Sequence, residues 1–206
     1  MKNKLIIIGA SGHGGVVADL ADLLGYSVCF WDDDISKKMS SYVVFERGKI
    51  VPENSSIIIG IGSNIIRRNI SMQYENDSYV SLIHPNSSIA KKIKIGIGSV
   101  VVAGACINNG ASIGDHCIIN TAVVVDHDCM INDFVHISPS ATLCGNVTIG
   151  KGSWVGAGAI IIQGIKVGKN VIIGAGSVIL KDIPDNATVV GNPGKIIKIR
   201  SNNYEY

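Results

Sequence analysis

One histidine of this chain is followed by an acidic residue and lies eighteen positions before a glycine. His127 and Asp128 belong to the run D-H-D-C, and the glycine is Gly145. A neutral imidazole is the most common general base in proteins, and a neighbouring carboxylate orients it and stabilises its charged form. A glycine amide that no side chain shields can donate a hydrogen bond to a developing oxyanion. From spacing alone, a solvated histidine at a surface corner stays an alternative.

A second set of candidates follows the first apolar run of the chain, at residues 4–8. The turn after this run reads G-A-S-G-H-G, and two acidic residues follow a second apolar run about twenty residues on. Backbone amides at a strand-to-helix turn suit a phosphate group, and an acidic side chain at the later position suits a ribose or a base. The turn does not match G-x-G-x-x-G, so a tight turn beside a solvated acidic loop stays an alternative. The candidates are Gly9, Ser11, Gly12, His13, Asp32 and Asp33.

Aliphatic residues recur at every sixth position in the part of the chain that contains His127, Asp128 and Gly145, so the structure that they form must position these three residues. All sixteen positions from Ile89 to Ile179 in this register hold Ile, Val or Leu, and the residue two places earlier is small or aliphatic, as at Cys117 and Cys129. A short strand supplies two inward positions, and three hexads close a triangular coil of eighteen residues. The repeat predicts a parallel β-solenoid of just over five coils that needs a cap at each end. One coil separates His127 from Gly145, so the two are expected to stack about 4.8 Å apart.

The residues before the repeat form a separate α/β pattern. Apolar runs at 4–8, 27–31 and 56–59 predict buried parallel strands, with helical spacing after the first and the third. A last strand is expected at 79–83. This alternation predicts a Rossmann-like domain over residues 1–84, followed by the solenoid domain with a C-terminal cap over residues 85–206. Gly62 and Asn64, in the turn after the third strand, are added to the substrate-binding candidates.

Composition excludes several classes of function. The chain has 206 residues, a net charge of +2 and no basic block, so a nucleic-acid partner is not expected. No apolar run approaches the ~18 residues of a membrane span. The apolar run near the N-terminus ends in the glycine-rich turn rather than in a cleavage site, which favours a buried strand over a signal peptide and predicts a cytoplasmic protein. Five cysteines without a C-x-x-C pair indicate no disulfide framework.

The solenoid and the leading α/β unit, together with several short motifs, resemble the bacterial sugar acetyltransferases of the hexapeptide superfamily. The motifs are G-A-S-G-H-G, D-H-D-C, A-T-L-C-G-N-V-T-I-G and V-x-G-N-P-x-K. The chain is most similar to the nucleotide-sugar N-acetyltransferases of the bacillosamine and perosamine pathways, and sialic acid O-acetyltransferases share the pattern. The resemblance implies a left-handed β-helix and a homotrimer with active sites between adjacent solenoids.

The resemblance also implies an activity in bacterial surface glycan biosynthesis. It is the direct transfer of acetyl from acetyl-CoA, without a metal, to the 4-amino group of a nucleotide-linked 4-amino-4,6-dideoxy sugar. His127 is then the general base, Asp128 holds it, and the Gly145 amide binds the thioester carbonyl. Those acetyl-CoA candidates that the resemblance supplies are Gly145, His136, Gly191, Asn192, Pro193 and Lys195. Asn120 is placed near the sugar, and the turn and acidic residues named above are placed in the nucleotide-sugar pocket. Trp154, one coil after His136, is expected to shape the CoA cleft.

Three other interpretations stay open. Transfer to a sugar hydroxyl, as on sialic acid, is the runner-up, because one histidine serves both reactions. A zinc lyase on the same fold would use His116, His127 and His136, but their spacing is unlike the close histidine pair of that family. A non-enzymatic scaffold is disfavoured by the common register of His127 and Gly145. Outside these roles, His116 is expected at a corner that faces solvent or a trimer interface.

Overall fold

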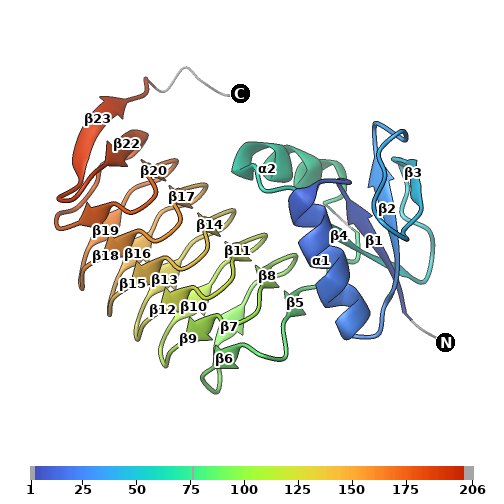
Figure 1. Cartoon of the computed structure of the whole chain (residues 1–206), viewed down its shortest axis with the longest axis horizontal. Coiled ribbons are helices and arrows are strands. Elements are labelled where there is room, and N and C mark those ends of the chain that lie inside the picture. The colour runs from blue at the N-terminus through green and yellow to red at the C-terminus, as the bar shows by residue number, and fades with distance from the viewer. Residues whose placement is uncertain (1–2, 76, 202–206) are drawn as a thin grey trace.

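The computed structural model describes residues 3–75 and 77–201, and shows a small α/β unit at one end of a long solenoid (Figure 1). Both units that the sequence predicts are therefore present. Within the described ranges, neither helix is long and apolar enough to cross a membrane.

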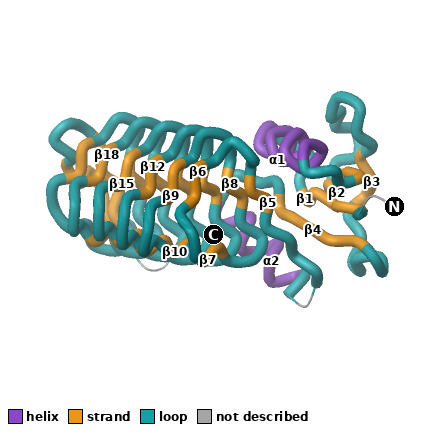
Figure 2. Tube along the Cα trace, turned by 90° about the horizontal axis from the view of Figure 1, so that it is seen from below, coloured by secondary structure: helices purple, strands orange, loops and turns teal. Residues whose placement is uncertain are grey.

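The α/β unit is a four-stranded parallel sheet between two helices. Its elements are β1 (Lys4–Ile8), α1 (Gly12–Leu23), β2 (Ser27–Asp32), β3 (Val44–Glu46), β4 (Ser55–Ile59) and α2 (Asn64–Gln73). The strand order is β3-β2-β1-β4, and Figure 2 shows the helices on opposite sides of the sheet. Successive β1 residues point to opposite faces, so Leu5 and Ile7 pack with α1 while Ile6 and Ile8 pack with Ile70 of α2.

The solenoid repeats a two-residue strand every six residues from 88 to 179, as the aliphatic pattern predicts. Partner strands lie eighteen residues apart in three parallel sheets, as with Ile119 and Ile137, so three hexads make one coil. Inward aliphatics form a continuous core, which also holds the thiols of Cys117 and Cys129. The strands are β6 (Ser88–Ile89), β7 (Lys94–Ile95), β8 (Val100–Val101), β9 (Cys106–Ile107), β10 (Ser112–Ile113), β11 (Ile118–Ile119), β12 (Val124–Val125), β13 (Met130–Ile131), β14 (His136–Ile137), β15 (Thr142–Leu143), β16 (Thr148–Ile149), β17 (Trp154–Val155), β18 (Ile160–Ile161), β19 (Lys166–Val167), β20 (Ile172–Ile173) and β21 (Val178–Ile179).

Short strands cover both ends of the coil stack. The expected strand at 79–83 is only partly correct, because Tyr79 makes an isolated bridge to Ile57 and the strand itself is β5 (Leu82–Ile83). β5 pairs with β8 of the solenoid and covers a sheet edge that would otherwise be unpaired. At the other end, β22 (Ala187–Val190) pairs with β20, and β23 (Lys195–Ile199) folds back on β22. The tail therefore caps the last coil, as predicted. The domain boundary at residue 84 stays a prediction.

Candidate active site

His127 lies at the corner after β12, with its ring against Gly145 of the next coil. A methyl group on Gly145 would overlap Nε2 and Cε1 of this ring. The other ring nitrogen, Nδ1, pairs with Asp128 Oδ2 at 2.9 Å. Within the described ranges, no protein acceptor takes the Gly145 N–H. The imidazole and an unpaired amide thus lie side by side, which is the arrangement that the eighteen-residue spacing predicts.

Two carboxylates tune this imidazole. The hydrogen bond to Asp128, and then the charge of Asp126, raise the pKa of His127 above its ordinary value. Asp126 Oδ1 accepts the His127 backbone N–H and the Asn108 side-chain amide, each at 2.8 Å. Pairing with Asp128 assigns the proton of the neutral ring to Nδ1, so the Nε2 lone pair is free on the side of Gly145. In the single chain the His127 side chain is 60% exposed, so water screens these charges.

A second cluster lies where the solenoid meets the α/β unit. His136 of β14 stacks on Trp154 of β17, with ring centroids 5.8 Å apart and an interplanar angle of 9°. Its Nε2 lies 3.2 Å from Asn120 Nδ2. His13, in the first turn of α1, lies 6.3 Å from His136 between ring centroids. The structure therefore brings residues proposed for the acetyl-CoA side and for the sugar side into one neighbourhood.

Both histidines of this neighbourhood are neutral at pH 7. Burial lowers the pKa of His13 to about 4, with further contributions from His136 and Arg67. Burial also lowers the pKa of His136 to about 4, followed by the positive charge of Arg67. A neutral imidazole does not form an ion pair with an anion, and His136 makes its contacts here by stacking on Trp154 and through Nε2 to Asn120.

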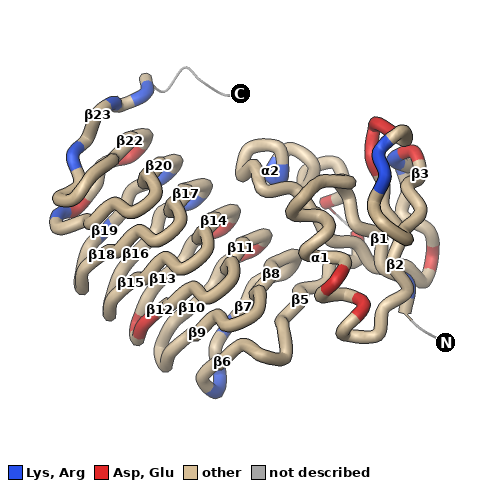
Figure 3. Tube along the Cα trace, in the orientation of Figure 1, with Lys and Arg blue, Asp and Glu red and all other residues tan. Residues whose placement is uncertain are grey.

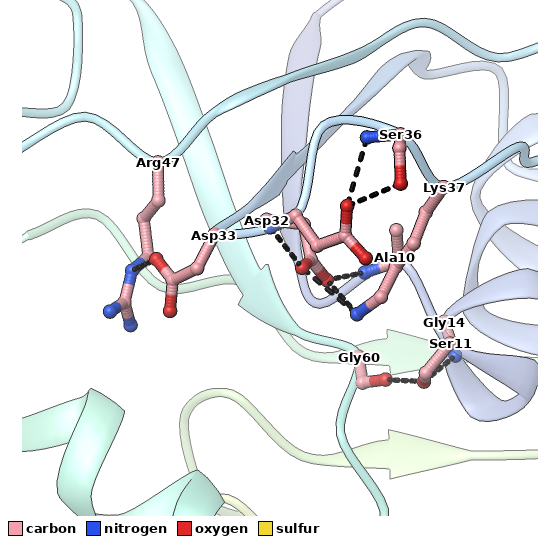
Figure 4. Close-up of polar contacts among 10 residues, drawn as sticks. Ala10, Ser11, Gly14, Asp32, Asp33, Ser36, Lys37, Arg47 and Gly60 are labelled. Carbon is pink, nitrogen blue, oxygen red and sulfur yellow. Dashed lines mark hydrogen bonds and ion pairs between the residues drawn. The ribbon is translucent and has the colours of Figure 1, made fainter.

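The glycine-rich turn is tied to the end of β2 (Figure 4). Asp32 Oδ2 accepts the Ala10 backbone N–H at 2.7 Å, and Lys37 Nζ bridges both carboxylate oxygens at 2.9 and 3.0 Å. Ser11 caps α1 and donates its hydroxyl to Gly60 O at 2.7 Å. Asp32 thus fixes the backbone of the turn that contains Gly9 and Gly12.

Some of the substrate-binding candidates are engaged elsewhere. Asp33 pairs with Arg47 at 2.8 Å and lies on the other side of the strand end from the Ala10 contact (Figure 4). Asn64 donates its side-chain amide to Gly152 O and Ser153 O, at 3.0 Å each. The structure does not bring the side chains of Asp33 and Asn64 to the Asp32 contact.

The tail candidates lie apart from His127 within one chain. Gly191 donates its N–H to Ser177 Oγ at 3.1 Å, and Gly194 donates to Val178 O at 2.8 Å, next to β21. β21 stacks three coils beyond β12, about 14 Å along the axis at the usual strand spacing. Gly191, Asn192, Pro193 and Lys195 therefore do not share a wall with His127 in the single chain.

The expectation of a solvent-facing corner for His116 is wrong. Its side chain is buried because Phe134 stacks on one face at 5.1 Å and Tyr79 of the α/β unit packs edge-on at 4.6 Å between centroids. His127, by contrast, lies at an exposed corner, so these two supposed zinc ligands do not converge. No group of three His, Cys, Asp or Glu side chains in residues 3–75 and 77–201 could hold a metal ion.

Arg67 is the site residue that the sequence does not reveal. It lies on α2 beside Arg68 and reads as a surface cation, yet it is 1% exposed and reaches the solenoid. No local pattern marks it, because the solenoid carbonyls that it bonds, those of His116 and Phe134, lie far from it in the sequence.

Comparisons with known proteins match both units. The family described as PglD N-terminal domain matches residues 4–74, and the family described as bacterial transferase hexapeptide (six repeats) matches residues 146–181. The acetyltransferase domain of PglB from Neisseria gonorrhoeae, solved in complex with acetyl coenzyme A, is 42% identical. It has a TM-score of 0.91, and the match covers 96% of this chain and 100% of that one.

Perosamine N-acetyltransferases are also similar to this chain. The enzyme from Caulobacter crescentus, solved as a variant in complex with CoA and GDP-perosamine, is 32% identical. Its TM-score is 0.90, with 95% of this chain and 97% of that one covered. The GDP-perosamine N-acetyltransferase of Escherichia coli O157:H7 is 29% identical over 67% of this chain. That match spans 65% of the relative's own length, just under two thirds.

Proposed function

The chain belongs to the bacterial sugar N-acetyltransferase family of the bacillosamine and perosamine pathways, and on that premise we propose its reaction. It transfers the acetyl group of acetyl-CoA to the 4-amino group of a nucleotide-linked 4-amino-4,6-dideoxy sugar, in bacterial surface glycan biosynthesis. The observation that supports this most directly is the free Nε2 of His127 beside the unpaired Gly145 amide.

The chemistry follows from these two groups. The sugar amine attacks the thioester carbonyl, so that a C–N bond forms and the carbonyl oxygen becomes an oxyanion. The Gly145 N–H stabilises that oxyanion. His127 Nε2 takes the proton that the amine loses, and Asp128 stabilises the resulting imidazolium. When the C–S bond breaks, His127 returns the proton to the CoA thiolate, and the ring is neutral again.

This direct transfer needs no covalent enzyme intermediate. Cys129 follows Asp128 in the sequence, but its thiol is buried in the solenoid core and donates to Cys144 O at 3.2 Å. Burial raises the pKa of the Cys129 thiol, which disfavours the thiolate that a nucleophile requires. The histidine and the glycine amide therefore carry the chemistry without it.

His136 and Trp154 are proposed to line the acetyl-CoA side, and Asn120 and His13 the sugar side. Their stacking and hydrogen bonding at the joint between the units support this, because an acceptor held by the α/β unit must reach a thioester at the solenoid. Asp32 is proposed to shape the nucleotide pocket through the turn that it fixes. The roles of Asp33, Gly62, Asn64 and Gly191 to Lys195 remain predictions.

The active form is proposed to be a homotrimer that closes the site between subunits. His127 lies between two solenoid faces, and one of them, here called the uncharged face, has only uncharged outward residues. These residues are Ser88, Cys106, Val124, Thr142, Ile160 and Val178. Figure 3 shows an acidic segment beside β12, at the corner that follows this strand, and no charge on β15 and β18 of this face. A second solenoid packed there would cover the exposed corner of His127 and exclude water from it.

Sedimentation equilibrium tests the assembly. The wild type is expected at three times the 21.7 kDa chain mass, and Val124→Lys at a smaller mass with little activity, because it buries an unpaired charge. Ser112→Lys, on a different solenoid face, is the matched control and is expected to stay trimeric. A wild-type monomer with full activity would contradict the shared site.

Release of free CoA thiol across a panel of nucleotide sugars tests the reaction. The panel includes UDP- and GDP-linked 4-amino-4,6-dideoxy sugars, their 4-hydroxy counterparts and free sialic acid. Thiol release is expected with an amino sugar nucleotide only, and mass spectrometry should find one added acetyl group. Release with the hydroxy sugars alone would replace N-transfer by O-transfer.

We also infer a cytoplasmic location, because acetyl-CoA is made in the bacterial cytoplasm.

A further inference from the structure

Arg67 is a buried cation that contacts no carboxylate in the described ranges. All five N–H groups of its guanidinium donate to neutral acceptors. Nε bonds His116 O at 2.8 Å, Nη1 bonds Ile61 O at 3.0 Å and Gly62 O at 3.1 Å, and Nη2 bonds Asn64 Oδ1 at 2.7 Å and Phe134 O at 3.1 Å. Burying a charge is costly unless every hydrogen bond is made. This arrangement therefore has a use that an apolar contact between the units would not serve.

The acceptors on the solenoid come from three successive coils. Arg67 takes the carbonyls of His116 and Phe134, and Asn64 takes that of Gly152, one further coil along. All three corner residues have a positive φ, between 53° and 71°. The backbone ladder here uses the preceding carbonyl instead, as when Phe134 N–H donates to Asp115 O. The side chains of α2 thus donate hydrogen bonds to a row of corner carbonyls that the backbone ladder of the solenoid does not use.

The other bonds of Arg67 end on the loop that leads into α2. Gly62 belongs to this loop, and its backbone lies at His136. His136 in turn lies 6.3 Å from His13 at the start of α1. One side chain therefore fastens the α/β unit, the entry loop of α2 and two solenoid corners in a single register.

We propose that Arg67 is a positioning residue that sets the nucleotide-sugar unit against the solenoid, and so fixes the distance between His13 of the α/β unit and His136 of the solenoid. The catalytic consequence of this proposal rests on the proposed function, whereas the geometry of the joint does not. Arg67 touches neither of the groups that do the chemistry, His127 and Gly145. Its effect is on where the amine is delivered, and a small misplacement of reacting groups is expected to cost about 10²-fold in rate.

The charge of Arg67 gives this role a signature that a purely structural clamp would lack. It contributes, after burial, to the lowered pKa values of both His136 and His13. A variant without the charge is expected to raise the pKa of each imidazole. A lysine at this position keeps the positive charge but lacks the planar guanidinium with its five N–H donors. It is expected to leave both pKa values low while the α/β unit is misplaced.

Three variants test the proposal: Arg67→Met, Arg67→Lys and, as the matched control, Arg68→Met on the exposed side of α2. Histidine Cε1–H resonances are followed by NMR against pH, with His136→Asn to assign the signal. The His136 titration is expected to move to higher pH in Arg67→Met only. Both Arg67 variants are expected to lower acetyl transfer to the nucleotide amino sugar about 10²-fold, with the dissociation constant for acetyl-CoA within about threefold of wild type.

Wild-type transfer rates in Arg67→Lys would overturn the proposal, and so would an unchanged His136 titration in a folded Arg67→Met. If Arg67→Met does not fold, Arg67→Lys decides alone. If wild type transfers acetyl to no sugar on the panel, the proposed function fails, while the histidine titrations still decide whether Arg67 sets the joint.

Discussion

The imidazole of His127 lies so close to Gly145 that no side chain fits between them. Eighteen residues separate the two in sequence, and the coil returns the chain to the same corner. Nε2 of the ring faces the glycine, and the Gly145 N–H has no partner in the described part of the chain. A proton acceptor and a hydrogen-bond donor are therefore fixed next to each other by the repeat itself.

Gly145→Ala is expected to displace the His127 ring, because the added methyl overlaps Nε2 and Cε1 while the exposed ring is free to swing out. Turnover should fall about 10²-fold, with acetyl-CoA affinity little changed in isothermal titration. The same substitution in a His127→Ala background is the control and should cost little more. Full additivity of the two losses would mean that the glycine acts independently of the ring.

Asp128→Asn is expected to move the acidic limb of the kcat/KM profile to lower pH. A general base works in its neutral form, and the Asp128 hydrogen bond, with Asp126, raises the pKa of His127 above its ordinary value. The wild-type limb should therefore lie above about pH 6.5. Removing the carboxylate lowers that pKa, so more of the base is neutral at pH 6, although the plateau rate falls because the ring is less well oriented. A limb that stays in place in Asp128→Asn would contradict the pairing as the cause.

Asp32→Asn is expected to raise the dissociation constant of the nucleotide sugar about tenfold, because a charge-assisted hydrogen bond is lost. The amide cannot hold both Lys37 and the Ala10 N–H as the carboxylate does, so the glycine-rich turn loosens. Asp34→Asn is the matched control, since among the described residues the Asp34 carboxylate accepts hydrogen bonds from Ser36 alone, at the exposed end of the same loop. If Asp32→Asn weakened the binding of acetyl-CoA and of the nucleotide sugar equally, the assignment of this turn to the sugar pocket would be contradicted.

The solenoid could be predicted from the sequence because its rule is local and repeats. Each hexad places an aliphatic residue inward, so the period fixes the strands, the eighteen-residue pairing and the contact between His127 and Gly145. The apolar runs of the α/β unit were readable for the same reason, since alternate residues of β1 are buried against the helices on the two faces of the sheet.

The joint between the units could not be predicted, because it depends on contacts between distant residues. Arg67 has the sequence context of a surface cation, and only the fold places it at the corner carbonyls of His116 and Phe134. His116 is buried because Tyr79 of the other unit packs against it. The strand expected at 79–83 is shortened to Leu82–Ile83, which pairs with β8 of the solenoid. Each of these features requires the relative placement of two units, which no local period encodes.

The rate of acetyl transfer in His127→Ala, measured under single-turnover conditions with the acceptor found by the thiol-release panel, tests the central claim most directly. The imidazole beside the Gly145 amide predicts a fall of roughly 10²–10⁴-fold, with the dissociation constant for acetyl-CoA within about threefold of wild type. A rate close to that of the wild type would contradict the account and remove His127 from the mechanism.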